Sequence, residues 1–370
     1  MKKKILVVGS IPPPYHGCSV MNNYLLSSHL TKQFNIIFLD ISDRRGIKNL
    51  GVLDIKNIYF AFYHGLNFIY YLFYYNPDLI YISISQVFWG YIRDLIFLFS
   101  SRFIDKKILI HLHGGAFHEF YQSMPWLLAK LTRYIFRGRI WGIVLDESLK
   151  TCFDGLIKSE KIYCVPNGIK DISIHRNPNQ AKNGAIHILY LSNLMKSKSF
   201  IELFKIVPEI VRHFPNLVFT FAGEKTESSE IEKVYNIIKN YKLEKFVKLP
   251  GIDKDREKEK LLVESDVFVF LLLAQQGQPL VILEAIAAGL PVIATDRGFI
   301  RETVLDGITG FVISPGDTNA LLERLILLIR DEKYRQNMGS EGKKRFQNYY
   351  RLERWASNLQ AVFKSVLEHE

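Results

Sequence analysis

Short apolar runs alternate with longer helical patterns along almost the whole chain. The runs are rich in β-branched and aromatic residues, which is typical of buried strands. Strands that alternate with helices are typical of parallel, doubly wound sheets, so the pattern predicts an α/β protein. The predicted strands are, in chain order, Lys4–Val8, Asn35–Leu39, Leu79–Ile84, Lys107–His111, Gly142–Leu145, Lys161–Val165, Ile186–Leu191, Leu217–Ala222, Val247–Leu249, Val267–Leu271, Pro291–Ala294 and Gly310–Ile313.

The predicted strands form two series, which are separated by turn-forming sequence between Asn167 and Ala185. A chain of 370 residues also exceeds the size at which single cores stop growing, about 250–300 residues. We therefore expect two doubly wound domains, residues 1–170 and 171–350, that face a central cleft, because ligands of such sheets bind beyond the carboxyl ends of the strands. A last helical pattern, from about Arg351 to Leu367, has no strand of its own.

A long stretch without a charged residue runs from Asn57 to Pro77. Its length matches the roughly 20 residues that a bilayer span requires. However, it contains Asn57, His64 and Asn67, and tyrosines are spread along it. We expect a largely buried amphipathic helix, and a membrane span is the alternative.

Composition narrows the class of protein. An apolar share of 48% and a charged share of 23% allow sizeable cores and a soluble surface, which excludes disordered and collagen-like chains. Cys18, Cys152 and Cys164 have neither disulfide nor zinc spacing, so we expect a reducing cytosol. The basic and apolar start of the chain is similar to a signal peptide, but Pro12–Pro14 end the apolar run too early.

The net charge of +11 favours an anionic partner: nucleic acid, an acidic membrane or a phosphorylated ligand. Residues 1–170 hold 20 Lys and Arg against 11 Asp and Glu, so most of the excess lies in the first domain. Residues 125–139 combine apolar and aromatic side chains with Lys130, Arg133, Arg137 and Arg139, a pattern that suits an anionic membrane surface. An ordinary helix with a solvated basic face is the alternative. No motif that reads nucleic acid occurs, so we expect no nucleic-acid partner.

The segment from Gln276 to Pro291 contains the most informative pattern. Pro279 suits the first turn of a helix and Gly289 the residue just past its end, and Glu284 is the only charged residue between them. A carboxylate in an apolar helix needs a partner. That partner is either a core hydroxyl or Lys, or else a ligand hydroxyl such as a ribose diol. The N-terminus of the same helix presents backbone N–H groups that suit a phosphate.

No Walker loop, Gly-x-Ser-x-Gly motif or zinc spacing occurs. The charged run from Asp253 to Lys260 is expected to form a solvated loop and helix.

The segment from Asp266 to Ile313 resembles the C-terminal signature of the retaining GT-B glycosyltransferases, the glycosyl transferases group 1 set (family 4). In that family the signature contains Asp-Val-Phe-Val, a Glu eight residues before a second Glu, Ala-x-Ala-x-Gly-Leu-Pro-Val-Ile-Ala-Thr, and Asp-Gly-x-Thr-Gly. This chain has Asp266–Val269, Glu284, Ala285–Thr295 and Asp306–Gly310.

Four more blocks match the family in order and spacing. They are similar to its Gly-rich phosphate loop, its His-Gly after a strand, its interdomain Pro-Asn-Gly, and its Gly-Arg-Leu…Lys-Gly block. In this chain they are residues 11–20, residues 111–115, residues 165–169 and residues 191–198. The resemblance therefore covers nearly the whole chain and implies a GT-B architecture with two Rossmann-like domains, in which the last helix, 351–370, packs back on the first domain.

The resemblance also implies roles for single residues. Lys198 would neutralise the donor diphosphate, Glu284 would hold the nucleotide ribose, His113 would contact the transferred sugar, and Gly17 would let the backbone approach the phosphates. The implied catalytic residues are His113, Lys198 and Gln276, and the implied donor-binding residues are Gly17, Asn193, Lys198, Pro279, Leu280, Val281 and Glu284.

Two positions depart from the family pattern. Gln276 stands where the family has its first acidic residue, so it can hydrogen-bond sugar hydroxyls but offers no negative charge to an oxocarbenium centre. Asn193 stands where the family has Arg, which leaves Lys198 more of the phosphate charge to neutralise.

The resemblance implies a metal-independent retaining glycosyltransferase of the hexosyltransferase type. It would use a nucleotide-diphosphate-sugar as substrate and no cofactor. The acceptor would be a glycan or lipid-linked glycan of bacterial-type surface polysaccharide or glycolipid assembly. We expect residues 1–170 on the acceptor side, residues 171–350 on the donor side, and a place in the cytosol, free or peripheral at the inner face of the membrane. The alternative, motivated by Gln276, is a non-catalytic sugar-nucleotide-binding or scaffold subunit.

Overall fold

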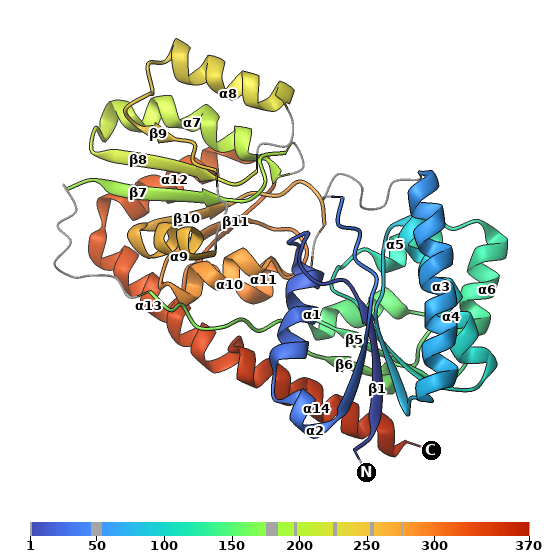
Figure 1. The fold of residues 1–370 in the computed structure, drawn as a ribbon. Coiled ribbons are helices and arrows are strands. Elements are labelled where there is room, and N and C mark those ends of the chain that lie inside the picture. Colours follow the sequence, from blue (N-terminus) through green and yellow to red (C-terminus); the bar gives the residue numbers. More distant parts are fainter. Residues whose placement is uncertain are drawn as a thin grey trace. The chain divides into compact units, whose positions relative to one another are not determined.

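The computed structural model describes residues 2–45, 54–174, 184–195, 198–224, 228–251, 255–275 and 277–369. The chain divides into two compact units (Figure 1). Unit 1 consists of Met1–Gly168 together with Leu352–Glu370, and unit 2 consists of Ile169–Arg351. Each unit contains one six-stranded sheet, in which every strand pair is parallel.

The sheet of unit 1 has the strand order β2-β1-β3-β4-β5-β6. Its strands are β1 (Lys4–Gly9), β2 (Asn35–Asp40), β3 (Leu79–Ser83), β4 (Lys107–His111), β5 (Ile140–Val144) and β6 (Ile162–Cys164). The helices are α1 (Gly17–Ser27), α2 (Leu30–Gln33), α3 (Ile55–Tyr75), α4 (Phe88–Phe103), α5 (Phe117–Gln122), α6 (Trp126–Phe136) and α14 (Leu352–Glu368), with short 3-10 helices η2 (Glu147–Phe153) and η3 (Ser159–Lys161).

Helices α3, α4 and α6 cover one face of this sheet, where α4 contacts both of its neighbours (Figure 1). Apolar residues of the strands, among them Ile80 and Ile82, form a buried cluster with Phe68 of α3 and Phe97 of α4. The C-terminal helix α14 covers the other face. Its Phe363 packs edge-on against Tyr81, which points away from the α3 side because side chains alternate along a strand.

The sheet of unit 2 has the strand order β12-β11-β10-β7-β8-β9. Its strands are β7 (Ile186–Leu191), β8 (Leu217–Ala222), β9 (Val247–Lys248), β10 (Val267–Phe270), β11 (Val292–Thr295) and β12 (Gly310–Ile313). The helices are α7 (Phe200–His213), α8 (Ser228–Asn240), α9 (Asp255–Glu264), α10 (Leu280–Ala287), α11 (Ile300–Thr303), α12 (Thr318–Arg330) and α13 (Glu332–Tyr349). All four residues of β10 are buried, as expected for a parallel strand covered on both faces.

The twelve predicted strands all form, and their ends differ from the prediction by at most two residues. The two-domain α/β architecture is therefore confirmed. The sequence placed the domain boundary at residue 170 and the start of the last helix at residue 351, and the structure divides after Gly168 and after Arg351.

The expectation that residues 57–77 form a largely buried helix is wrong. The segment is α3, and only His64, Gly65, Phe68 and Leu72 of it are buried. The reason is that the absence of charged residues along a segment does not reveal how many faces of the helix are covered by neighbouring elements. No helix in the described part of the chain combines the length and the apolar character that crossing a bilayer requires.

Candidate active site

The sequence-implied donor residues of unit 2 follow strands that are neighbours in the sheet. Strand β7 pairs with β10 in parallel, so their carboxyl ends meet at one edge. The loop after β7 carries Asn193 and Lys198, and the segment after β10 leads to Pro279 and α10. The sheet therefore brings the cation and the start of α10 to the same edge, where ligands of doubly wound sheets bind.

Lys198 is partly buried at this edge. Its Nζ lies 5.6 Å from the centre of the Phe270 ring, at the end of β10, and its backbone carbonyl accepts a hydrogen bond of 2.6 Å from Tyr190 Oη. Burial lowers the pKa of Lys198 to about 8. At neutral pH a Lys in this setting is still protonated, but burial makes its charged form energetically unfavourable. Binding of an anion reduces this desolvation penalty.

The residue after Lys198 has an unusual backbone. Ser199 adopts φ of 49°, in the left-handed region, which favours glycine. This conformation turns the chain into α7.

Asn193 lies in a tightly packed turn. Gly223, which follows β8, has φ of 147°, and a Cβ there would lie 2.0 Å from the Ser192 carbonyl oxygen. A side chain at residue 223 would therefore displace the backbone next to Asn193.

Helix α10 begins at Leu280, directly after Pro279, whose backbone is extended and which provides no side-chain cap. The first amides of a helix have no intrahelical partner, so those of Leu280 and Val281 are suited to a ligand anion. Gln278 is buried just before this helix and donates a 3.1 Å hydrogen bond to Thr303 Oγ1. This hydrogen bond holds in place the segment that leads into α10.

Glu284, on α10, forms an ion pair with Lys258 of α9, with 2.8 Å between Oε1 and Nζ. The side chains are 13% and 25% exposed. Of the two partners that the sequence left open for Glu284, a Lys is therefore present in the structure. A carboxylate can accept about four hydrogen bonds, so this pair is compatible with a contact to a ribose diol.

The same ion pair corrects the expectation for the charged run 253–260. Arg256, Glu257 and Lys260 are exposed as expected, but Lys258 turns inward to Glu284. Gln276 lies outside the described residues.

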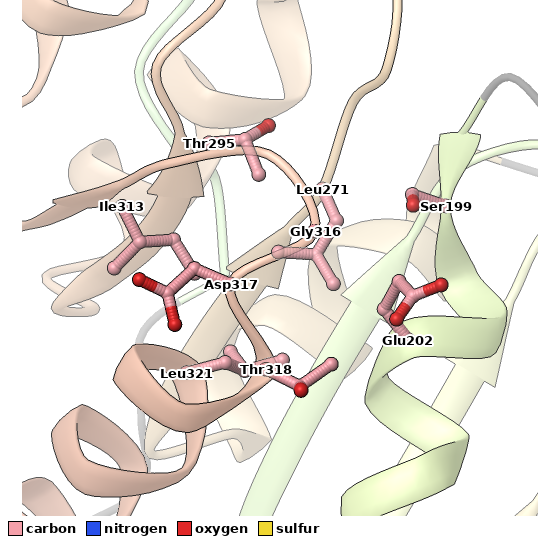
Figure 2. Close-up of a pocket in the computed structure, with 9 residues that line it drawn as sticks. All are labelled: Ser199, Glu202, Leu271, Thr295, Ile313, Gly316, Asp317, Thr318 and Leu321. Carbon is pink, nitrogen blue, oxygen red and sulfur yellow. The ribbon is translucent and has the colours of Figure 1, made fainter.

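A shallow pocket also opens at the carboxyl edge of this sheet, at the start of α7 and α12 (Figure 2). Its two carboxylates have local roles, since Glu202 pairs with Lys205 and Asp317 accepts a hydrogen bond from the Ala320 amide. The negative charges of Glu202 and Asp317 disfavour the binding of a phosphate group in this pocket. None of the sequence-implied site residues lines the pocket. The lining residues are Ser199, Glu202, Leu271, Thr295, Ile313, Gly316, Asp317, Thr318 and Leu321.

In unit 1 the structure places His113 just after β4, in a chain of polar contacts. His113 Nε2 lies 3.5 Å from Ser83 Oγ, at the end of β3, and Ser83 Oγ donates a 3.1 Å hydrogen bond to Asn22 Oδ1. Asn22 Nδ2 donates to the Ser10 carbonyl, at the end of β1. Three adjacent strand ends are thus tied together around His113.

His113 is neutral at physiological pH. Burial lowers the pKa of His113 to about 4, although an interaction with Asn167 raises it in part. The ring stacks on His111 with 3.9 Å between centroids, and burial holds the pKa of His111 well below its ordinary value too. A neutral imidazole both donates and accepts a hydrogen bond, as a contact with a sugar hydroxyl requires.

Gly17 is the first residue of α1. His16 caps this helix, since its Nδ1 accepts from the Ser19 amide and Ser19 Oγ accepts from the His16 amide. A Cβ on Gly17 would meet no protein atom within 4 Å. Packing inside unit 1 therefore does not require glycine here.

Sequence reasoning missed four polar residues of these two clusters. They are Asn22, Ser83 and Asn167 near His113, and Lys258 beside Glu284. Only Asn167 had a signal, because it lies in the Pro-Asn-Gly block. The others are single polar residues whose contacts come from strand and helix packing. Across the described ranges no group of His, Cys, Asp and Glu side chains is arranged to hold a metal ion.

Comparison with known structures identifies the fold. A glycosyltransferase from Rickettsia africae ESF-5 superimposes over 100% of both chains, with a TM-score of 0.77 and 17% identity. Anabaena Alr3699/HepE, solved in complex with UDP, covers 98% of this chain and 100% of its own, with a TM-score of 0.75 and 16% identity. The two units thus have the GT-B architecture.

Comparison of sequences shows which family the second half of the chain resembles. Residues 171–345 match the family model of glycosyl transferases group 1. N-acetyl-alpha-D-glucosaminyl L-malate synthase of Bacillus anthracis is 28% identical over 50% of this chain and 46% of its own length. The capsular polysaccharide biosynthesis glycosyltransferase CapM of Staphylococcus aureus is 28% identical over 61% of this chain and 62% of its own. The matches thus span about half to three fifths of these relatives. The family model thus supports the expected resemblance to the glycosyl transferases group 1 over residues 171–345, just under half of the chain.

Proposed function

We propose that this protein is a retaining glycosyltransferase that moves a sugar from a nucleoside-diphosphate-sugar to a hydroxyl group of a glycan or lipid-linked glycan. The observation that carries the proposal is the meeting of a partly buried ammonium, Lys198, with the start of α10 at one sheet edge. Ammonium groups and helix N-termini both bind phosphate. The name of the relative CapM supports a place in bacterial surface polysaccharide or glycolipid assembly.

In this proposal unit 2 binds the donor. Lys198, Asn193 and the backbone N–H groups of Leu280 and Val281, which follow Pro279, hold the diphosphate, and Glu284 accepts hydrogen bonds from the ribose hydroxyls. Lys258 lies 2.8 Å from Glu284 and favours its ionised form, which is the better acceptor. Gln276 would hydrogen-bond hydroxyls of the transferred sugar.

The reaction breaks the bond between the sugar anomeric carbon and the diphosphate oxygen, and it forms a bond from that carbon to the acceptor oxygen on the same face. The acceptor proton passes to the leaving phosphate oxygen. Lys198 and the α10 amides stabilise the charge that develops on the diphosphate. The neutral His113 hydrogen-bonds a hydroxyl of the transferred sugar, and Gly17 leaves room for the donor phosphates. No step calls for a metal ion.

Unit 1 would bind the acceptor, at the cytoplasmic face of the membrane. The excess of basic over acidic residues in positions 1–170 supports an acceptor or surface that is anionic.

A thermal-shift screen with UDP, GDP, ADP and their sugars tests donor binding, because a ligand that binds only the folded state raises the melting temperature. Purified protein is then assayed for donor hydrolysis and sugar transfer. We expect turnover that is lost in Lys198→Ala and Glu284→Ala but retained in the control Lys205→Ala, whose side chain is 55% exposed on α7. Nucleotide binding without turnover of any donor would instead support the non-catalytic scaffold.

A further inference from the structure

Helix α3 presents a face of large apolar side chains to solvent. Its exposed positions recur at helical spacing on the side opposite Phe68 and Leu72, which are buried in the core. Lys56 is the only charged residue in the helix. The exposed apolar and aromatic residues of α3 are Ile55, Ile58, Tyr59, Phe62, Tyr63, Leu66, Ile69, Tyr70, Phe73 and Tyr74, with exposed fractions from 36% to 87%.

This face is held rigidly. Asp54 caps the helix through the Asn57 amide, and Gly65 lets α3 approach α4, since a Cβ there would lie 3.2 Å from the Ile96 side chain. On the outer side, Tyr59 stacks on Tyr63 and Tyr70 stacks on Tyr74. The helix therefore stays on the sheet while its outer face remains available.

The same layer of helices carries more exposed apolar groups. On α4, Phe103 is 82% exposed, and on α6, Trp126 and Leu127 are 71% and 64% exposed. Arg102 of α4 lies over the ring of Tyr134 of α6, with 5.7 Å to the ring centre. Because α4 contacts both α3 and α6, exposed apolar groups lie on three neighbouring helices of this layer (Figure 1).

Basic residues border this surface. Lys130, Arg133 and Arg137 are exposed on the same side of α6 as Trp126, and α6 contains no acidic residue. In the same layer Asp94 is buried and paired with Arg93, and Asp105 lies near Arg102 and Arg139. The net charge around the apolar face is positive.

We propose that α3 and α6 together form a docking face for an anionic lipid bilayer, in which α3 lies in the plane of the interface with its outer side chains among the lipids. Three observations favour lipid over a protein partner. The apolar side chains form a broad convex helix surface, tyrosines with an apolar ring and a polar hydroxyl recur along it, and cations border it. Because Phe68 and Leu72 hold α3 to the sheet, the helix would lie on the surface of the bilayer and would not cross it. This inference is independent of the proposed sugar chemistry.

The test is sedimentation of the full chain with phosphatidylcholine vesicles, with and without phosphatidylglycerol. We expect wild-type protein to pellet with the anionic vesicles and Phe62→Gln/Phe73→Gln to bind at least about tenfold more weakly. The matched control Tyr235→Gln/Tyr241→Gln changes exposed aromatic residues of unit 2 and should bind as wild type does. The triple variant Lys130→Gln/Arg133→Gln/Arg137→Gln should lose the preference for phosphatidylglycerol.

Tryptophan fluorescence gives a second readout. Of the four tryptophans, Trp126 is 71% exposed and Trp89 of α4 is 41% exposed, whereas Trp141 and Trp355 are buried. Docking should therefore shift the emission to shorter wavelength, and Trp126→Phe should reduce that shift. Wild-type protein that ignores anionic vesicles, or binding that Phe62→Gln/Phe73→Gln leaves unchanged, would overturn the proposal. A stable dimer in lipid-free buffer that Phe62→Gln/Phe73→Gln dissociates would also overturn it, because the face would then belong to a second copy of the chain.

Discussion

Replacing Lys198 by Met should stabilise the protein while it removes diphosphate binding. Burial lowers the pKa of this Lys from 10.5 to about 8, so its charged form is disfavoured in the folded state. A shift of about 2.5 units corresponds to about 3 kcal/mol, which is an upper bound for a side chain that is only partly buried. We therefore expect Lys198→Met to raise the free energy of unfolding by about 1–3 kcal/mol at pH 7.

The pH dependence identifies the cause of this gain. The folded pKa lies below the unfolded value, so the penalty is fully present below about pH 8 and disappears as the pH rises towards 10.5. At pH 10 the gain should fall to about one quarter of its value at pH 7. A hydrophobic gain from the Met side chain would be the same at both pH values.

The assay is urea unfolding followed by circular dichroism at pH 7 and pH 10, together with the thermal shift caused by UDP at pH 7. The control is Lys205→Met, whose side chain is 55% exposed and which should change stability by less than about 0.5 kcal/mol. A Lys198→Met variant that is less stable than wild type at pH 7, or that gains equally at both pH values, would refute the reasoning. Retained UDP binding would refute the role of Lys198 in donor recognition.

The remaining predictions concern single positions in both units. Glu284→Gln removes the ion pair with Lys258 and should lower the free energy of unfolding by about 1–2 kcal/mol and weaken UDP binding, measured by thermal melting and titration calorimetry. Lys198→Arg should keep UDP binding constant between pH 7.5 and 9.5, whereas wild-type affinity should fall more than about tenfold over that range as Lys198 loses its proton. His113→Ala should lower sugar transfer by about 100-fold, and because the pKa of His113 is about 4, the wild-type rate should show no inflection near pH 6.5. Gly223→Ala should cost about 3 kcal/mol or more, since its φ is 147° and the Ser192 carbonyl lies 2.0 Å from the new Cβ; unchanged melting would contradict this.

The sequence by itself determined the order and type of the elements. Parallel strands that are buried on both faces appear in the sequence as short apolar runs. Segments such as Ile186–Leu191 are therefore recognisable without any tertiary information. The helix that contains Glu284 was also readable from its ends, because Pro279 and the Gly after the helix have fixed conformational roles. Its motifs predicted the similarity to glycosyl transferases group 1 that the family model finds in residues 171–345.

The partners of the site residues were decided by tertiary structure alone. Lys258 stands in a run of charges that reads as a solvated face, and only the packing of α9 beside α10 brings it to Glu284. In the same way, Asn22 and Ser83 meet near His113 because β1, β3 and β4 are neighbours in the sheet, although they are far apart in the sequence.

Helix α3 shows the same limit in the opposite direction. The sequence of residues 55–75 is predominantly apolar and contains a single charged residue. Such a sequence is equally compatible with burial in a protein core and with exposure to lipid. Which faces are covered depends on how many elements pack against the helix. Here the sheet and α4 cover only a narrow stripe around Phe68 and Leu72, and the remaining aromatic surface is left for a partner. The sequence thus determined the elements and indicated the family resemblance, because local patterns encode them. Contacts and exposed faces required the tertiary structure, because residues distant in sequence create them.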